Sequence, residues 1–344
     1  MKNLFALRLH RHQLMTAPFA LLRVLLPYGL FLLPLLTQAQ SVALKPSEAG
    51  LRVEIDGRLF TEYVVKDTPR PFLYPIIGAA GESVVRNFPM KKGVPGEEKF
   101  QDHPHHRSLW FAHGKVNGID FWGEFTVFGR QEHTGFGEVK AAGNQGSFLT
   151  RTKWVAPTGQ AVLTDERRIV IIALAGGERT LDFNITLKAT ECDLVLGDTK
   201  EGTMALRLCP SLSLNSSKGF VDTGSSTGHA FNSAGDRDKD IWGKHANWVC
   251  YYGPDLKGNA VGVVIFSHPE NFRSPTTWHA RDYGLFAVNP FGLHDFEPDK
   301  PAGAGDYTIK RGGSLTLRYR FYFAKGQPTP AELDARFQAY ARGK

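Results

Sequence analysis

Cysteine is scarce in this chain of 344 residues. Only three cysteines occur, Cys192, Cys209 and Cys250. An odd number excludes a fully paired disulfide framework, and none of the three has metal-ligand spacing to another. Export would permit a bridge between Cys192 and Cys209, but apolar neighbours such as Leu194 and Leu208 favour buried free thiols.

Long apolar runs are missing outside the N-terminus. There, a region with four basic and no acidic residues leads into an apolar run from Val24 to Leu36, followed by the small residues Thr37 and Ala39. This order is typical of a secretory signal peptide cleaved after Ala39. The run is shorter than the about 20 residues that a membrane span needs, so an uncleaved anchor is only the alternative. We expect residues 1–39 to be removed and the protein to be secreted or periplasmic, without a stable membrane span.

A strong excess of one charge is missing as well. The net charge of +7 falls to +3 without residues 1–39, because these hold four basic and no acidic residues. Such a balance is not typical of nucleic-acid binding, which needs lysine and arginine clustered on one face, so we expect no nucleic-acid partner. The chain also lacks a GxGxxG sequence and a P-loop, the usual signals of a nucleotide site.

Short runs of β-branched and aromatic residues dominate the remaining chain. Asp56-Gly57 separates two of them and predicts a hairpin, while 36 glycines and 24 phenylalanines are typical of a turn-rich protein with aromatic packing. We predict an all-β fold, a large antiparallel β-sandwich in one domain over residues 40–344. The expected strands are Leu51–Ile55, Leu59–Val65, Arg168–Leu174, Leu181–Ala189, Met204–Leu208, Trp248–Tyr252, Ala260–Phe266, Leu285–Val288 and Leu315–Phe323.

One helix is expected, at the C-terminus. Thr329 and Glu332 form a capping box around Pro330, and Leu333, Phe337 and Tyr340 share one face. We expect this helix at the edge of the sandwich.

The stretch from Asp102 to His113 concentrates histidine, with His103, His105, His106 and His113 beside Arg107 and Trp110. Histidine changes charge near neutral pH, and its neutral ring is a common metal ligand. In an extended chain His103 and His105 point one way and His106 the other. The pattern indicates proton transfer, a metal or a polar ligand. Trp122 follows closely in the sequence.

Three further segments carry candidate chemistry. Glu201 precedes an apolar strand and could act as a base, while Trp242 could stack on a sugar. The third segment, residues 267–292, again gathers histidine, arginine and tryptophan, and we predict that it shares one pocket with the first histidine stretch. Its candidate substrate-binding and catalytic residues are His268, Trp278, His279, Arg281 and Asn289.

The sequences DHPHHRSLWFAHGKVNGIDFW, DTKEG and HPENFRSPTTWHARDYGLFAVNPFG resemble the PmoA-like family, a domain family of unknown function despite its methane label. The resemblance covers nearly the whole mature chain and implies a secreted bacterial protein of environments rich in polysaccharide. Alkane oxidation is not supported, because a membrane monooxygenase subunit needs several spanning helices. A weaker resemblance is to galactose-mutarotase-like supersandwich proteins, in which His serves as acid and Glu as base. By that analogy His105 or His106 and Glu201 are catalytic, with His279 as another candidate base.

We therefore expect a carbohydrate-active acid/base enzyme of epimerase, lyase or hydrolase type. Arg107 and Arg281 would bind a carboxylate or stabilise an oxyanion. No cofactor is expected, but the alternative is a transition metal held by ligands among His103, His105, His106, His113, His268 and His279. A third possibility is a non-catalytic glycan-binding module built on Trp110, Trp122, Trp242 and Trp278. The expected partner is a glycan or small molecule. Substrate and oligomeric state stay open.

Overall fold

The computed structural model describes residues 40–214 and 227–343. The predicted signal peptide, residues 1–39, lies outside the described residues. Within the two described ranges, no helix combines the length and the apolar character that crossing a membrane requires.

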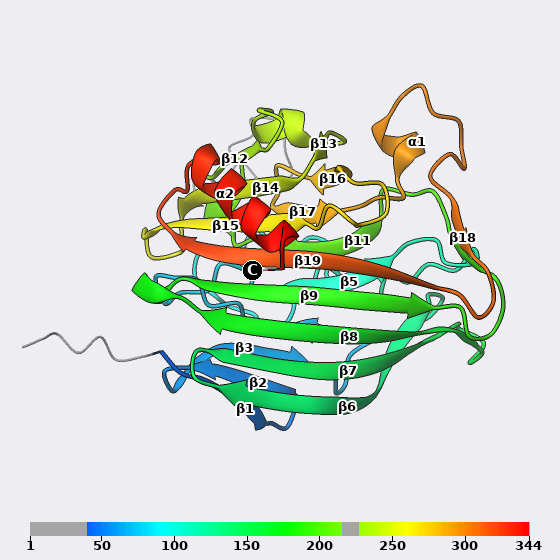
Figure 1. Cartoon of the computed structure of the whole chain (residues 1–344), viewed down its shortest axis with the longest axis horizontal. Helices are drawn as coiled ribbons and strands as arrows, with labels where there is room; N and C mark the ends of the chain where they lie inside the picture. The colour runs from blue at the N-terminus through cyan, green and yellow to red at the C-terminus, as the bar shows by residue number, and fades with distance from the viewer. Residues whose placement is uncertain (1–39, 215–226, 344) are drawn as a thin grey trace, which may run out of the picture. The chain divides into compact units, whose positions relative to one another are not determined.

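Two large sheets make up most of the structure (Figure 1). The nine-stranded sheet contains, in order, β1 (Val42–Pro46), β2 (Gly50–Ile55), β3 (Arg58–Val64), β4 (Phe72–Leu73), β5 (Leu109–His113), β11 (Gly202–Arg207), β17 (Leu285–Val288), β16 (Thr276–Ala280) and β13 (His245–Ala246). The eight-stranded sheet contains β12 (His229–Asn232), β14 (Trp248–Pro254), β15 (Ala260–Ser267), β19 (Ser314–Lys325), β9 (Arg179–Lys188), β8 (Ala161–Ala173), β7 (Gln145–Val155) and β6 (Arg130–Ala142).

Several smaller elements complete the fold. They are the strand pair β10 (Leu194–Leu196) and β18 (Tyr307–Ile309), the helices α1 (Leu293–Phe296) and α2 (Pro330–Ala341), and the 3-10 turns η1 (Ala175–Gly177), η2 (Pro210–Leu212) and η3 (Asp238–Ile241). The ladders of both large sheets are antiparallel, for example β5 with β11 and β8 with β9. The predicted all-β antiparallel sandwich is thus confirmed.

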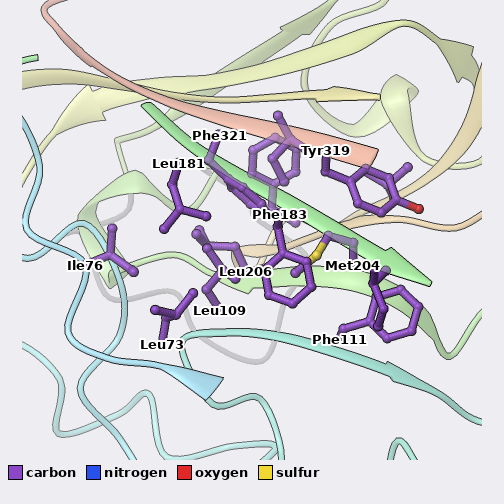
Figure 2. Close-up of a cluster of buried hydrophobic side chains, with 14 of the residues drawn as sticks. Leu73, Ile76, Leu109, Phe111, Leu181, Phe183, Met204, Leu206, Tyr319 and Phe321 are labelled. Carbon is purple, nitrogen blue, oxygen red and sulfur yellow. The ribbon is translucent and has the colours of Figure 1, made fainter. Parts of the chain in front are cut away.

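The main core lies between the two sheets (Figure 2). Because side chains alternate along a strand, β5 and β11 each turn every second residue inward, and β9 and β19 do the same from the other sheet. The inward residues are Leu109, Phe111, Met204, Leu206, Leu181, Phe183, Tyr319 and Phe321, each at most 1% exposed. Full burial of such an aliphatic or phenyl side chain stabilises the fold by about 1.5–3 kcal/mol.

The same alternation gives the nine-stranded sheet a second, outward face. Trp110 and Ala112 of β5, Ala205 of β11, and Leu285 and Ala287 of β17 form a separate buried cluster there. Trp122, from the loop after β5, belongs to this cluster, and the loop before β5 carries His103, His105 and His106.

The helix α2 forms as predicted but lies elsewhere than expected. The Oγ1 atom of Thr329 accepts a hydrogen bond from the backbone N of Glu332, at 3.2 Å. Its buried residues Leu333, Phe337 and Tyr340 pack with Trp248, Phe266 and Tyr322. The helix therefore covers the outward face of β14, β15 and β19 (Figure 1), and the expected position at the edge of the sandwich was wrong.

All three cysteines are free. Cys209 is buried as expected, and burial raises the pKa of its thiol to about 11. Cys250 is buried as well. Cys192 is exposed, contrary to the expectation of a buried thiol, because it stands in the turn between β9 and β10 rather than within a strand.

Candidate functional site

Three histidine rings meet in the loop before β5. The ring centroids of His103 and His106 are 4.7 Å apart, those of His105 and His106 4.5 Å, and those of His103 and His105 5.7 Å. The chain is not extended here, because His103 has a φ of 43° and its carbonyl oxygen accepts a hydrogen bond from the N of His106. The predicted opposite orientation of His103 and His106 was therefore wrong.

These rings form one side of a cavity of about 280 Å³, just below the range for ligand pockets, about 300–1,000 Å³. Its walls come from the loop before β5, the loop after β5, the residue before β11 and the turn before β17. The lining residues are His103, His105, His106, Asp120, Trp122, Gly123, Phe125, Phe128, Glu201 and Tyr283.

Asp102 orients His103. The carboxylate is hydrogen-bonded to the Nδ1 atom of His103 and accepts hydrogen bonds from Nη1 of Arg86 and Nη2 of Arg207, both at 2.9 Å. Burial raises the pKa of this carboxyl, but the hydrogen bond with His103 and the charges of the two guanidinium groups lower it by more. The pKa of Asp102 is therefore well below its usual range. Asp102 is thus an anion, and Nδ1 of His103 donates to it. In the neutral ring the Nε2 atom then carries the free lone pair.

His105 and His106 are held neutral. Burial is the main cause that lowers the pKa of His105 to about 3, followed by the charge of Arg70. Burial and Arg207 also lower the pKa of His106 far below its ordinary value. Arg207 donates from Nη1 to Nδ1 of His106 at 3.2 Å, so the proton of this ring is on Nε2. At neutral pH both rings can bind hydroxyl groups, but neither carries a charge.

Glu201 lines the cavity together with the histidines. Its side chain is 38% exposed, and burial raises the pKa of its carboxyl although the nearby Lys200 opposes the shift. A carboxyl of this kind keeps its proton to a higher pH than an ordinary glutamate.

The segment before Glu201 is fixed by His279 of β16 and by Asn289, the residue that follows β17. Nδ1 of His279 bonds with the carbonyl oxygen of Lys200 at 2.9 Å. Nδ2 of Asn289 donates to the carbonyl oxygens of Thr199 and Lys200, at 2.9 and 3.0 Å. His279 and Asn289 thus support the position of Glu201 from behind, and neither lines the cavity.

The structure divides the predicted site residues into groups. His103, His105, His106, Trp122 and Glu201 line the cavity. Trp110 lies beneath it, stacked on His106 at 5.4 Å, and Arg107 turns aside to pair with Glu124 at 2.8 Å.

The remaining predicted residues lie apart from the cavity lining. The Nε2 atom of the buried His113 bonds with the carbonyl oxygen of Gly197, and Trp278 donates to the carbonyl oxygen of Ala246 inside the main core. His268 packs against Tyr340 of α2. Trp242 and Arg281 line a second cavity. The two histidine-rich segments therefore meet only in part.

Sequence reasoning missed several residues of this site. Arg86 and Arg207 are buried and hold Asp102, while Tyr283 stacks on His103 at 5.2 Å. Arg207 had a signal, since it is a lone arginine at the end of an otherwise apolar strand. Asp120, Phe125 and Phe128 had none beyond their nearness to Trp122.

Metal binding was the alternative raised by the histidine density. Within residues 40–214 and 227–343, no group of three or more His, Cys, Asp or Glu side chains is arranged to hold a metal ion. Elemental analysis of the purified protein tests this alternative directly.

Comparison with known proteins gives a family but no activity. The model of the Family of unknown function (DUF6807) matches residues 50–338, and no curated protein matches. The PmoA-like membership predicted from the motifs is not part of this match and stays a prediction.

Solved structures that resemble the chain include carbohydrate-active proteins. A heparan sulfate lyase mutant from Pedobacter heparinus shares 10% identity at a TM-score of 0.35, over 85% of this chain and 36% of the lyase. An α-galactosidase from Lactobacillus brevis shares 10% identity at a TM-score of 0.31, over 83% of this chain and 39% of the galactosidase. A GalM/aldose epimerase homologue from C. elegans shares 9% identity at a TM-score of 0.32, over 84% of this chain and 100% of the homologue. The chain thus spans about a third of the length of the lyase. Similarity at this level carries no argument about the site.

Proposed function

We propose that this chain, which belongs to the Family of unknown function (DUF6807), is a carbohydrate-active enzyme that moves protons with His103 and Glu201. The observation that carries the proposal is their placement in the walls of one cavity, His103 oriented by an ionised Asp102 and Glu201 with a raised pKa. As the leader sequence predicts, the protein would act in the periplasm or outside the cell.

His103 suits the role of general base. Its Nδ1 proton is directed to Asp102, which Arg86 and Arg207 keep ionised, so Nε2 is the atom that can accept a proton. The imidazolium formed in this way is stabilised by the adjacent carboxylate. His105 and His106, the residues first assigned to catalysis, would instead bind substrate hydroxyls as neutral rings.

Glu201 suits the role of general acid, the reverse of the role predicted by analogy. Burial raises the pKa of its carboxyl, so a protonated fraction persists at a higher pH than in an ordinary glutamate. In the step we propose, His103 removes the proton of a sugar hydroxyl while Glu201 protonates a sugar oxygen. One proton leaves the substrate and one joins it, so no co-reactant is needed. At an anomeric hydroxyl, the electrons of the broken O–H bond form the carbonyl double bond to the anomeric carbon. The bond from this carbon to the ring oxygen breaks, and the ring oxygen takes the proton of Glu201, so the ring opens. General acid–base catalysis contributes about 10²–10⁴-fold.

The remaining walls of the cavity suit a sugar. Trp122, Phe125, Phe128 and Tyr283 offer apolar ring surface, and the histidines and Asp120 offer hydrogen-bonding groups. A sugar ring has this same combination, with C–H groups on its faces and hydroxyls around its rim. Pockets that orient ligands typically combine apolar walls with a few polar groups.

The test is turnover of a panel of mono- and oligosaccharides in deuterated water, followed by NMR and mass spectrometry. The readouts are new anomers or epimers, deuterium on carbon, unsaturated products and hydrolysis products. We expect His103→Gln and Glu201→Gln to lose at least about 100-fold in rate. His229→Gln and Glu48→Gln, at side chains that are 56% and 94% exposed, are the matched controls. Wild-type rates in both site variants would contradict the proposal.

A non-catalytic glycan-binding role is the second candidate, because Phe125 stands at the cavity with 66% of its surface exposed. It predicts that the wild-type chain binds oligosaccharides without any product in the same assay. It also predicts that Phe125→Ala weakens binding while His103→Gln does not.

A further inference from the structure

A second cavity of about 240 Å³ lies beside the first. Its lining residues are Lys239, Trp242, Ala280, Arg281 and Asp282, none of which lines the first cavity. The guanidinium carbon of Arg281 is 5.5 Å from the ring centroid of Tyr283. The same tyrosine ring stacks on His103. A lining residue of the second cavity, Arg281, therefore contacts a lining residue of the first, Tyr283.

Arg281 has an unused charge. Its guanidinium lies near two aromatic rings, that of Tyr283 and that of Trp242 at 6.0 Å. Among the described residues, its side chain forms no hydrogen bond or ion pair with a carboxylate. The neighbouring Asp282 accepts a hydrogen bond from the backbone N of Tyr283 instead, at 3.0 Å. A half-buried guanidinium held by rings and lacking an anion is well placed to bind one from solution.

The side chains of Trp242 and Lys239 line the same cavity. The Nε1 atom of Trp242 is buried without a hydrogen-bond partner in the described part of the chain, although most buried polar groups have one. Lys239 is exposed at the rim. The charged lining residues Arg281, Lys239 and Asp282 carry a net charge of +1, and Asp238 and Asp240 add two negative charges nearby on η3. The balance favours a group with one negative charge over a highly charged one.

We propose that the second cavity binds the carboxylate or sulfate of a glycan unit that neighbours the unit in the first cavity. The substrate would then be an acidic oligosaccharide. This inference rests on the proposed function, since it takes the first cavity to be the place where a sugar reacts. Arg281 would act as a residue for specificity through a charge-assisted hydrogen bond to the anion, with the charge of Lys239 at the rim.

The test compares matched ligands by isothermal titration calorimetry. The probes are trigalacturonate, its fully methyl-esterified form, and a singly sulfated disaccharide with its unsulfated parent. The protein is the full chain carrying Glu201→Gln, which prevents turnover during the titration. We expect each acidic probe to bind at least about tenfold more tightly than its neutral partner. Arg281→Gln should remove that preference, and Lys239→Gln should reduce it.

Controls separate a local role from loss of the fold. Arg58→Gln changes an exposed arginine in the β2–β3 hairpin and should leave the preference intact. Arg281→Lys should keep part of it, because it retains the charge without the planar fork. Thermal unfolding of each variant shows whether it is folded, and the exposed Lys239 provides a site where substitution leaves packing unchanged.

Each outcome decides the inference. Equal binding of acidic and neutral probes overturns it, and so does a preference that survives both Arg281→Gln and Lys239→Gln. If sugars are turned over by the wild-type chain without such a preference, the inference fails and the proposed function stands. If the preference depends on Arg281 but no sugar is turned over, the proposed enzyme activity fails. Absence of binding by all probes overturns the inference, and the turnover assay on the wild-type chain then decides the proposed function by itself.

Discussion

Replacing Asp102 by asparagine should damage both the stability and the activity of the protein. The carboxylate accepts hydrogen bonds from Arg86 and Arg207, whose side chains are 0% and 1% exposed. Asparagine has the same shape but no charge and only one acceptor oxygen, so two buried guanidinium groups would lose their anion. Breaking a buried ion pair costs about 3–5 kcal/mol. Because Asp102 itself is 17% exposed, we expect a loss near the lower limit, about 3 kcal/mol of the free energy of unfolding.

The pH dependence gives a second readout of the same charge. The pKa of Asp102 is lowered in the folded protein, so its stabilising contribution is complete above the unfolded value of 3.8 and is lost as the pH falls below it. At pH 7 the wild-type chain should therefore be more stable than Asp102→Asn. The difference should shrink in acid, at a pH where the carboxyl of the folded chain becomes protonated.

Urea denaturation followed by circular dichroism measures these differences. Asp193→Asn is the control, because Asp193 pairs with Lys310 at the surface and such pairs contribute about 0–1 kcal/mol. The turnover rate should also fall, by up to the 10²–10⁴-fold that acid–base catalysis supplies. A loss of stability no larger than that of the control would refute the argument that Asp102 neutralises the two arginines.

Two further predictions concern the walls of the first cavity. Lys200→Met should raise the pKa of Glu201 further, because the charge of Lys200 opposes the effect of burial. If Glu201 donates a proton, the alkaline limb of the pH–rate profile moves to higher pH. A shift of this limb to lower pH would contradict the role of Glu201 as the acid. Phe125→Ala should raise KM for oligosaccharides several-fold and change the melting temperature little, because Phe125 is 66% exposed. The control is Val127→Ala, because Val127 is 70% exposed but does not line the cavity.

Local patterns predicted the strands of the core because burial and alternation act over a few residues. Asp56-Gly57 forms the turn between β2 and β3, with positive φ at both positions, and Thr329 caps α2. The long hairpin of β6 and β7 was not predicted. Most of β6 is exposed or only partly buried, so its sequence is charged and lacks the apolar alternation by which a half-buried strand is recognised.

The site was less predictable because its geometry depends on contacts between distant segments. The positive φ of His103 bends the loop. Arg207, which is 101 residues from His106 in the sequence, donates a hydrogen bond to the ring of His106. His268 was predicted to belong to the site but lies outside it. Its His-Pro sequence repeats that of His103, yet it lies against α2, because composition alone does not place a segment on one face of a sheet.

Strand β11 joins the fold and the site so closely that neither can be edited alone. Glu201 stands immediately before its first residue and Arg207 is its last, while Met204 and Leu206 face the main core. Inserting or deleting one residue within the strand would exchange its two faces beyond that point. Arg207 would then enter the apolar interior as the core lost leucine or methionine. Substitutions can therefore tune the chemistry of this protein, whereas changes of length in β11 would remove the folded protein itself.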